Sequence, residues 1–317
     1  MSTMSFAPQA GHFESSQPAA TPHFTKPTFL MCPPTYYDVN YVINPWMAGN
    51  LHRSSQANAA SQWKGLHDAI CQVADVELVE PQPGVPDMVF TAGAALVLHG
   101  VAVLSSFFHR ERRNEERYFR EWLLQHGFLV MDTRRETPFE GEGDALFEAE
   151  GSRLWAGHGQ RSCDCSHRAL EENWGKPVVA LRMVDPRFYS LHTCFCPLTG
   201  GYVMYYPEAF DRESIKKIEA HYPARKRIVV SEEDAVHFAC GALNIGRRVI
   251  MHDATPRIAA ELRHRGFEVV ELPLSEFVLG GGTARAMTLR LSDLDVTHAP
   301  IATTRYAVRS GASAECN

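Results

Sequence analysis

A short polar or glycine-rich segment, called a knot below, is followed directly by a short apolar run at five places along the 317-residue chain. The segments are Pro86–Phe90 before Ala94–Leu98, Glu142–Asp144 before Ala145–Phe147, His192–Phe195, Ala239–Gly241 before Arg247–Met251, and Gly280–Gly282 before Met287–Leu291. The knots recur about every 50 residues, and a fixed period in this range predicts a propeller or solenoid.

Helix-like stretches lie between the knots. Glu111–Gln125 places apolar side chains on one helical face, and Gly127 follows as a helix-ending residue. Similar helices and the strands expected after them are Ser214–His221, Pro256–Arg265, Phe128–Met131, Arg227–Val230 and Phe267–Leu272. The predicted unit is therefore helix, strand, knot, strand. Mixed α/β units of this kind are expected to close around an axis, with the knots gathered at the centre.

An open doubly wound sheet is the alternative α/β architecture. The chain has no GxGxxG after its first strand and no phosphate-binding loop. Gly280–Gly282 precedes a strand-like run and not a helix, so we interpret it as a tight turn.

The composition is that of a soluble globular protein, with 45% hydrophobic and 21% charged residues and a net charge of −6. Arg110, Arg112 and Arg113 alternate with glutamates, which indicates a solvated helix face and no nucleic-acid partner. No apolar run reaches 18 residues, so no membrane contact is expected.

The first 27 residues lack the apolar core of a secretory signal, and we expect a disordered tail there. Residues 28–295 are predicted to form one domain, followed by a C-terminal extension over 296–317. Eight cysteines are spread along the chain, and we expect reduced thiols in a cytoplasmic protein.

Several strings together resemble one family. They are Cys32-Pro33-Pro34, Ile43–Met47, Pro86–Ala92, Phe139–Asp144, Gly159-x-Arg161-Ser162, Thr193–Leu198 and Gly280–Gly282. From about residue 28 to 292 the chain resembles the amidinotransferase, dimethylargininase and arginine dihydrolase (pentein) group. The resemblance implies an α/β fold, a five-bladed ββαβ propeller whose central pocket binds a guanidine-bearing small molecule. A homodimer is one possible assembly.

The resemblance also implies a mechanism. A cysteine thiolate attacks the guanidinium carbon, a histidine moves protons, and carboxylates hold the planar cation. Glu142 and Asp144 lie two residues apart and would point to one side of an extended strand, so we expect them to grip the cation. Turn capping is the alternative role for both residues.

Three further residues are candidates for substrate binding. Asp87 is expected to hold the cation or to cap the turn after Pro86. Arg161 suits an α-carboxylate, with a structural role as the alternative. Asn44 is expected to line the pocket or to shape the turn before Pro45.

Five pocket positions depart from the family pattern. The position of the nucleophilic cysteine is Ala286, and the position of the histidine is Ser190. His192 replaces an aspartate, and Gly93 and Gly241 replace asparagines. Alanine cannot form a covalent intermediate. We interpret the pattern as divergence toward another chemistry, with the two glycines leaving room for a larger substrate, water or a cofactor.

His192 is the most informative replacement. With Glu142 and Asp144 nearby it could complete a metal site for iron, manganese or zinc. It could instead act as a general base, with no cofactor, or be an ordinary buried histidine.

The string from Cys163 to His167 is the other unusual feature. A CxCxH pattern can ligate zinc or iron, but CxC is less typical than CxxC. Cys163 or Cys165 could also supply a relocated nucleophile. Cys194, Cys196 and Cys240 are interpreted as structural.

The first functional hypothesis is an enzyme that acts on arginine or an N-hydroxylated arginine without a cysteine, by a mechanism that is metal-dependent or not. Formation of the nitrogen–nitrogen bond of a diazeniumdiolate siderophore is one setting for it. The second hypothesis is an arginine hydrolase or amidinotransferase with an engineered alanine. The third is an arginine-binding protein without activity.

Overall fold

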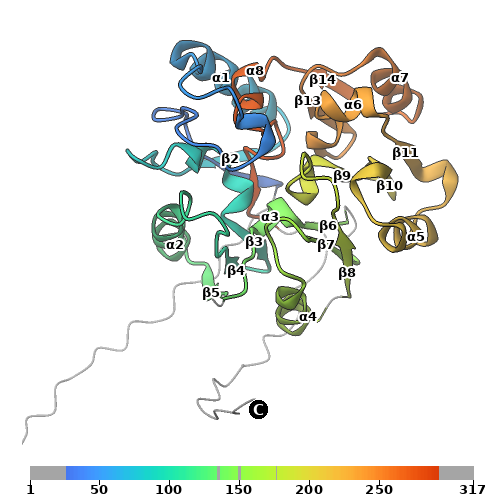
Figure 1. Ribbon diagram of the computed structural model, residues 1–317, viewed down its shortest axis with the longest axis horizontal. Helices are drawn as coiled ribbons and strands as arrows, with labels where there is room; N and C mark the ends of the chain where they lie inside the picture. Colours follow the sequence, from blue (N-terminus) through green and yellow to red (C-terminus); the bar gives the residue numbers. More distant parts are fainter. Residues whose placement is uncertain (1–25, 134–135, 149–150, 176, 293–317) are drawn as a thin grey trace, which may run out of the picture.

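The computed structural model describes residues 26–133, 136–148, 151–175 and 177–292. Five three-stranded sheets are arranged around a common centre (Figure 1). This arrangement confirms the predicted α/β propeller. The tail predicted for residues 1–27 falls almost wholly outside the described residues, and so does the C-terminal extension.

Each sheet is assembled in the same way. In the first, β3 (Ala95–Leu98) pairs antiparallel with β4 (Val101–Leu104), which pairs parallel with β5 (Leu129–Asp132). Three more sheets repeat the pattern: β6 (Ala145–Phe147), β7 (Leu154–His158) and β8 (Val178–Arg182); β9 (Phe195–Leu198), β10 (Tyr202–Tyr205) and β11 (Arg227–Val229); β12 (Leu243–Ile245), β13 (Arg248–Met251) and β14 (Glu268–Glu271). The repeat is therefore strand, hairpin strand, helix, strand, one strand more than the unit predicted from the sequence pattern alone.

The fifth sheet closes the ring with both ends of the described chain. β1 (Thr28–Met31) pairs antiparallel with β15 (Leu289–Arg290) and parallel with β2 (Asp75–Leu78). This sheet therefore joins the two ends of the described chain in one blade.

One helix lies on the outer side of each sheet, at the periphery of Figure 1. They are α1 (Gln56–Cys71), α2 (Glu115–Gln125), α4 (His167–Trp174), α5 (Arg212–His221) and α7 (Pro256–His264). Ser55, Asp211 and Thr255 accept hydrogen bonds from backbone N–H groups at the starts of α1, α5 and α7. Gly127 follows α2 at a φ of +81°, as its helix-ending role requires.

The knots are short helical turns and not extended strands. They include Pro86–Val89, Thr91–Gly93, α3 (Gly141–Asp144), Leu191–Thr193 and Ala239–Gly241. Two other short helices, α6 (Glu232–Val236) and α8 (Ser275–Val278), precede knots. Gly281 at a φ of +87° ends the segment after α8, which confirms the tight turn.

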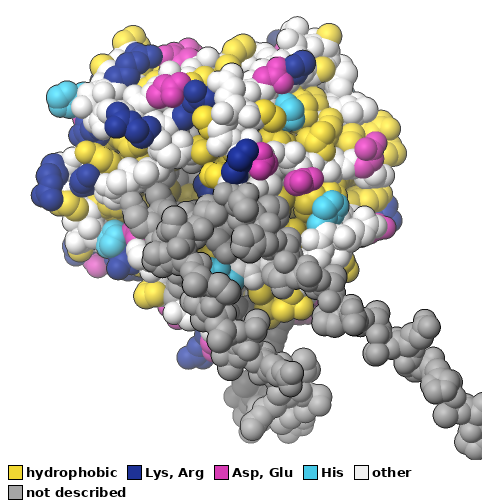
Figure 2. Space-filling model, turned by 180° about the vertical axis from the view of Figure 1, so that it is seen from behind, with side chains coloured by type: hydrophobic (Ala, Val, Ile, Leu, Met, Phe, Trp, Pro, Cys, Tyr) yellow, Lys and Arg dark blue, Asp and Glu magenta, His cyan; other side chains and the backbone are white. Residues whose placement is uncertain are grey.

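Among the described residues, no helix combines the length and the apolar character that crossing a membrane demands. Charged side chains of both signs are scattered over the face seen in Figure 2. A cytoplasmic location, the absence of a nucleic-acid partner and a homodimer remain predictions.

Candidate active site

The α3 turn directs its two carboxylates to different partners. Because residues 141–144 are helical, Glu142 and Asp144 do not share the strand face expected for them. Asp144 Oδ2 accepts a hydrogen bond from Ser162 Oγ (2.5 Å), and Asp144 Oδ1 accepts from Ser190 Oγ and Leu191 N (both 2.9 Å). Burial, reinforced by nearby Glu140, raises the pKa of Asp144 to about 6.

Glu142 binds another part of the chain. Its Oε2 accepts from Arg285 Nη2 and from the backbone N–H of Arg290, both at 2.9 Å. The carboxylate is buried, with 3% of the side chain exposed. Both α3 carboxylates thus have protein partners, and their role in gripping a substrate cation stays a prediction.

His192 is a buried neutral imidazole. Its Nδ1 lies 3.1 Å from the Gly143 carbonyl oxygen and 3.2 Å from Ser190 Oγ. Since a carbonyl only accepts, Nδ1 carries the proton and Nε2 keeps a free lone pair. Nε2 has no hydrogen-bond partner among the described residues. Burial first, then Arg285, Arg161 and Arg112, lowers the pKa of His192 to about 3.

The expected metal site is not preformed. The ligand atoms of His192, Glu142 and Asp144 are not within 4.8 Å of one another in the described part of the chain. Glu142 is bound to Arg285, and Asp144 accepts three hydrogen bonds. Without side-chain rearrangement these residues do not fit a shared cation, and the metal assignment remains a prediction.

Asp87, like Asp144, is a buried carboxylate without an ion pair among the described residues, but unlike Asp144 it has an oxygen without a hydrogen-bond partner. It is 2% exposed, and its Oδ1 has no hydrogen-bond partner among the described residues. The Tyr41 hydroxyl faces the carboxyl but does not meet hydrogen-bond geometry with Oδ1. Burial raises the pKa of Asp87 despite the positive charges of Arg112 and Arg161.

Arg161 and Glu140 form a buried ion pair beside this carboxylate. Arg161 Nη1 lies 3.1 Å from Glu140 Oε2, and Nη2 donates to the carbonyl oxygen of Ile43 (3.1 Å). The guanidinium also lies over the Tyr189 ring, 4.0 Å from its centre. Arg161 therefore has the structural partners that were its alternative role, and only Nε lacks a partner among the described residues.

Asn44 caps a turn. Its Oδ1 accepts from the backbone N–H of Trp46 and Met47, and its Nδ2 donates to the carbonyl oxygen of Gly280. The side chain thus joins the segment before Pro45 to the glycine turn.

Arg112 and Glu115 complete the group of buried charged residues around Asp87, called the Asp87 network below. Arg112 and Glu115 were expected on a solvated helix face, but they are 5% and 0% exposed. Arg112 donates to both oxygens of Glu115 (2.9 and 2.7 Å) and, through Nη2, to the Asp87 carbonyl oxygen. Local charge alternation could not show this, because the burial comes from packing against the knot 25 residues earlier.

Glu140, which the sequence marks only as part of the Phe139–Asp144 string, pairs with Arg161 and lies near Asp87 and Asp144. Its position beside Gly141 in the Phe139–Asp144 string was the available signal. With Glu115 paired to Arg112 and Glu140 to Arg161, Asp87 supplies one unpaired buried negative charge.

Ala286 lies in the core at 3% exposure, and its backbone carbonyl accepts from Ala92 N. Other side chains occupy the space expected beside Gly93 and Gly241. A Cβ on Gly93 would lie 3.1 Å from Arg112 Nη1, and one on Gly241 would lie 2.2 Å from Thr283 Oγ1. The expectation of open space is therefore wrong beside both glycines, because the side chains of Arg112 and Thr283 lie there.

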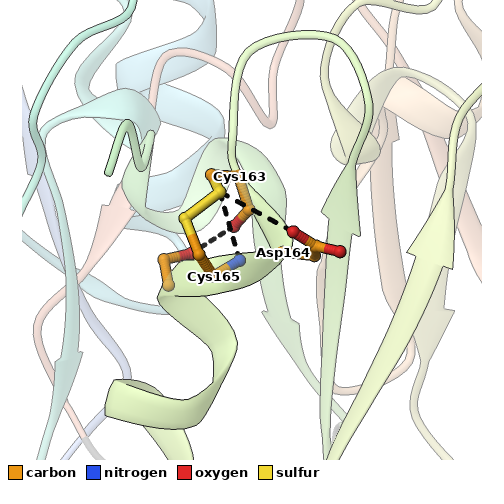
Figure 3. Close-up of a disulfide and its surroundings, with 4 residues drawn as sticks. Cys163, Asp164 and Cys165 are labelled. Atoms are coloured by element: carbon orange, nitrogen blue, oxygen red, sulfur yellow. Dashed lines mark hydrogen bonds between the residues drawn. A yellow bond between two sulfur atoms is a disulfide. The ribbon is translucent and has the colours of Figure 1, made fainter. Parts of the chain in front are cut away.

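Cys163 and Cys165 form a disulfide on the surface before α4 (Figure 3). The expectation of reduced thiols is wrong for this pair, and neither sulfur is free to act as a nucleophile in this state. With Asp164 the two sulfurs are close enough to hold a metal ion once reduced. Cys194, Cys196 and Cys240 are free and buried, as a structural role requires.

No family model matches the chain. It is 50% identical over 282 residues to the bifunctional arginine dihydrolase/ornithine cyclodeaminase ArgZ of Synechocystis sp., covering 88% of this chain and 40% of that protein. It is 37% identical over 264 residues to the N(G),N(G)-dimethylarginine dimethylaminohydrolase of Mycobacterium tuberculosis, covering 83% and 85%. The chain thus spans about 40% of the length of the bifunctional relative.

Solved structures of the ArgZ N-terminal domain have a TM-score of 0.84 and 52% identity, covering 84% of this chain and 98% of theirs. One is an asparagine-to-serine mutant covalently bound to a reaction intermediate, and another is a cysteine-to-serine mutant bound to substrate. The substituted asparagine and cysteine are separated by as many residues as Gly93 and Ala286. That match supports the assignment of both positions.

A cysteine-to-alanine mutant of AgrE has been solved with L-arginine, at 50% identity and a TM-score of 0.84, covering 84% of this chain and 40% of that one. The fold and the sequence identity to these relatives agree. The chain belongs to the guanidino-group modifying (pentein) superfamily, in the group of the arginine dihydrolases and dimethylargininases.

Proposed function

We propose that this chain binds the guanidinium group of arginine, or of an N-hydroxylated arginine, and acts on it without a cysteine nucleophile. The observation that carries the proposal is the buried Asp87 carboxylate, whose Oδ1 has no partner among the described residues. A guanidinium cation offers planar N–H donors to such an acceptor and neutralises its charge.

The relatives support recognition of arginine at a site that lacks a thiol. The alanine mutant of AgrE carries at the nucleophile position the residue type found here at 286, and it was solved with L-arginine. A methyl group at this position is therefore compatible with binding in that relative, and we infer the same for Ala286.

The chemistry has to come from other groups. His192 has a free lone pair at Nε2, but a pKa near 3 makes it a weak proton acceptor. A weak base suits a substrate that is reactive by itself. An N-hydroxylated guanidine carries its own nucleophilic oxygen and is less basic than guanidinium, which favours it over arginine as the substrate that is converted.

A metal cofactor and a role in siderophore biosynthesis stay predictions. Nitrogen–nitrogen bond formation for a diazeniumdiolate siderophore would need an oxidant, and the proposed ligands of a redox metal are not gathered. We therefore derive no metal-dependent step and favour a reaction that the side chains support alone.

Two observations favour a second candidate, an arginine-binding protein without turnover. Ala286 is chemically inert, and Ser190, in place of a histidine, donates a hydrogen bond to Asp144. These features remove both the nucleophile and the proton carrier that the family resemblance implies.

One experiment separates the candidates. The full chain is incubated with L-arginine and with N-hydroxyarginine, with and without added Fe²⁺, Mn²⁺ or Zn²⁺, and products are followed by mass spectrometry. Conversion of N-hydroxyarginine that is lost in His192→Gln supports the enzyme. Tight calorimetric binding without any product supports the binding protein, and absence of binding to both compounds overturns the shared part of the proposal.

A further inference from the structure

A cavity lined in part by Glu142 of the α3 turn lies apart from Asp87, which is not among its lining residues. It has a volume of about 300 Å³ and is lined by residues from several blades, including Phe29, Phe195, Asn244 and Arg290. Glu142 lines this cavity, whereas Asp144 does not. The cavity therefore belongs to neither the Asp87 network nor the disulfide.

The charges in this cavity do not balance. Its charged lining residues are Glu142, Arg285 and Arg290. Arg285 Nη2 is bound to Glu142 Oε2 (2.9 Å), and Arg285 Nη1 donates to the carbonyl oxygen of Thr288 (2.9 Å). Glu142 thus neutralises one guanidinium, and the cavity keeps one positive charge.

Arg290 carries that charge without a hydrogen-bond partner. In the described residues its backbone N–H donates to Glu142, but its guanidinium makes no hydrogen bond and only lies over the Phe29 ring, 4.9 Å from the centre. A guanidinium has five N–H donors, and an aromatic face satisfies none of them in the way an oxyanion does.

The electrostatic environment agrees with this geometry. Burial, followed by the charge of Arg285, lowers the pKa of Arg290 to about 10 in spite of Glu142. Arg290 is partly buried, so an anion in the cavity would replace water at its guanidinium and compensate its charge.

We propose that the cavity is a binding site for a small oxyanion, a phosphate or a carboxylate, with Arg290 as its principal ligand. Arg285 lines the same cavity and remains paired to Glu142. The volume holds a few waters or one small polyatomic anion. The site differs from the proposed guanidinium site in the sign of the charge it recognises.

Calorimetric titration of the full chain with inorganic phosphate, and separately with succinate, tests the proposal at constant ionic strength. We expect saturable binding of at least one of them at a single site, weakened at least tenfold in Arg290→Gln and less in Arg290→Lys. Arg110→Gln is the matched control, because it removes an exposed guanidinium elsewhere. Equal binding in Arg290→Gln, an equal loss in Arg110→Gln, or no binding of either anion overturns the proposal.

A measurement on the unmodified sequence guards against a variant that does not fold. An arginine-selective dicarbonyl reagent is applied with and without the bound anion, and modified peptides are quantified by mass spectrometry. The anion should slow modification of Arg290 and leave that of Arg110 unchanged. Equal rates at Arg290 with and without anion would contradict the site.

Discussion

The Ser190 hydroxyl donates a hydrogen bond to the Asp144 carboxylate, with Oγ 2.9 Å from Oδ1. The same Oγ lies 3.2 Å from His192 Nδ1, so one hydroxyl connects a buried acid to a buried imidazole. Because the serine proton points to Asp144 and the imidazole proton to Gly143, this chain of groups is not arranged to activate the serine.

Ser190→Ala should lower the free energy of unfolding by about 1–2 kcal/mol, because Asp144 loses a hydrogen bond in a buried site. The pKa of Asp144 should rise further above about 6, since that bond favours the charged form. Urea denaturation and a carboxyl NMR titration measure the two effects. Ser54→Ala, which breaks a hydroxyl–carboxylate bond to the more exposed Asp38, should cost less; an equal cost would contradict the role of burial.

Asp87→Asn should weaken binding of L-arginine by about 10- to 100-fold, because the amide offers no charge to the guanidinium. Calorimetry measures the loss. Asp68→Asn removes a carboxylate from the surface and should leave the affinity unchanged. Unaltered affinity in Asp87→Asn would show that another group holds the cation.

Arginine affinity should increase as pH rises through the folded-state pKa of Asp87. That pKa is raised above 3.8 in the free protein, so a proton must leave before the cation binds. The stability of the free protein has the opposite pH dependence. As pH rises, Asp87 contributes less to the free energy of unfolding, because its carboxyl loses the proton at lower pH in the unfolded chain than in the folded one. A calorimetric pH series measures the dependence, which should vanish in Asp87→Asn. A slope that persists in the variant assigns the titration to another group.

Ala286→Cys alone should not produce citrulline, ornithine or urea from arginine. Ser190 replaces the histidine expected as proton carrier, and other side chains occupy the space beside Gly93 and Gly241. A thiol by itself therefore does not restore the set of catalytic residues that the family resemblance implies. A colorimetric assay for citrulline and urea checks this. Strong release by the single variant would show instead that the alanine is the one change from an ordinary hydrolase.

Gly241→Ala should destabilise the fold by about 1–3 kcal/mol, because the added Cβ would lie 2.2 Å from Thr283 Oγ1. Gly65→Ala is the matched control, since its Cβ would meet nothing within 4 Å inside α1. Helix propensity predicts a gain of about 0.5–1 kcal/mol there. Thermal and urea unfolding compare the two, and a neutral Gly241→Ala would mean that Thr283 moves aside freely.

The repeat could be predicted from the sequence because its cause is local. The helix Glu115–Gln125, for example, has its apolar face and its glycine stop, Gly127, within a few residues. The pattern did not predict the hairpin strand Val101–Leu104, although it did predict the corresponding strand Arg248–Met251 as part of the run Arg247–Met251.

The site was decided by contacts between residues far apart in the chain. The sequence by itself determined that position 286 is an alanine, 190 a serine and 192 a histidine, which excludes covalent thiol chemistry there. Only the tertiary structure showed that Glu142 binds Arg285, that Asp144 binds Ser162 and Ser190, and that Asp87 is left without a cation. The physical reason is that a carboxylate's role depends on which donors packing brings to it, and in a ring of five blades those donors come from other repeats.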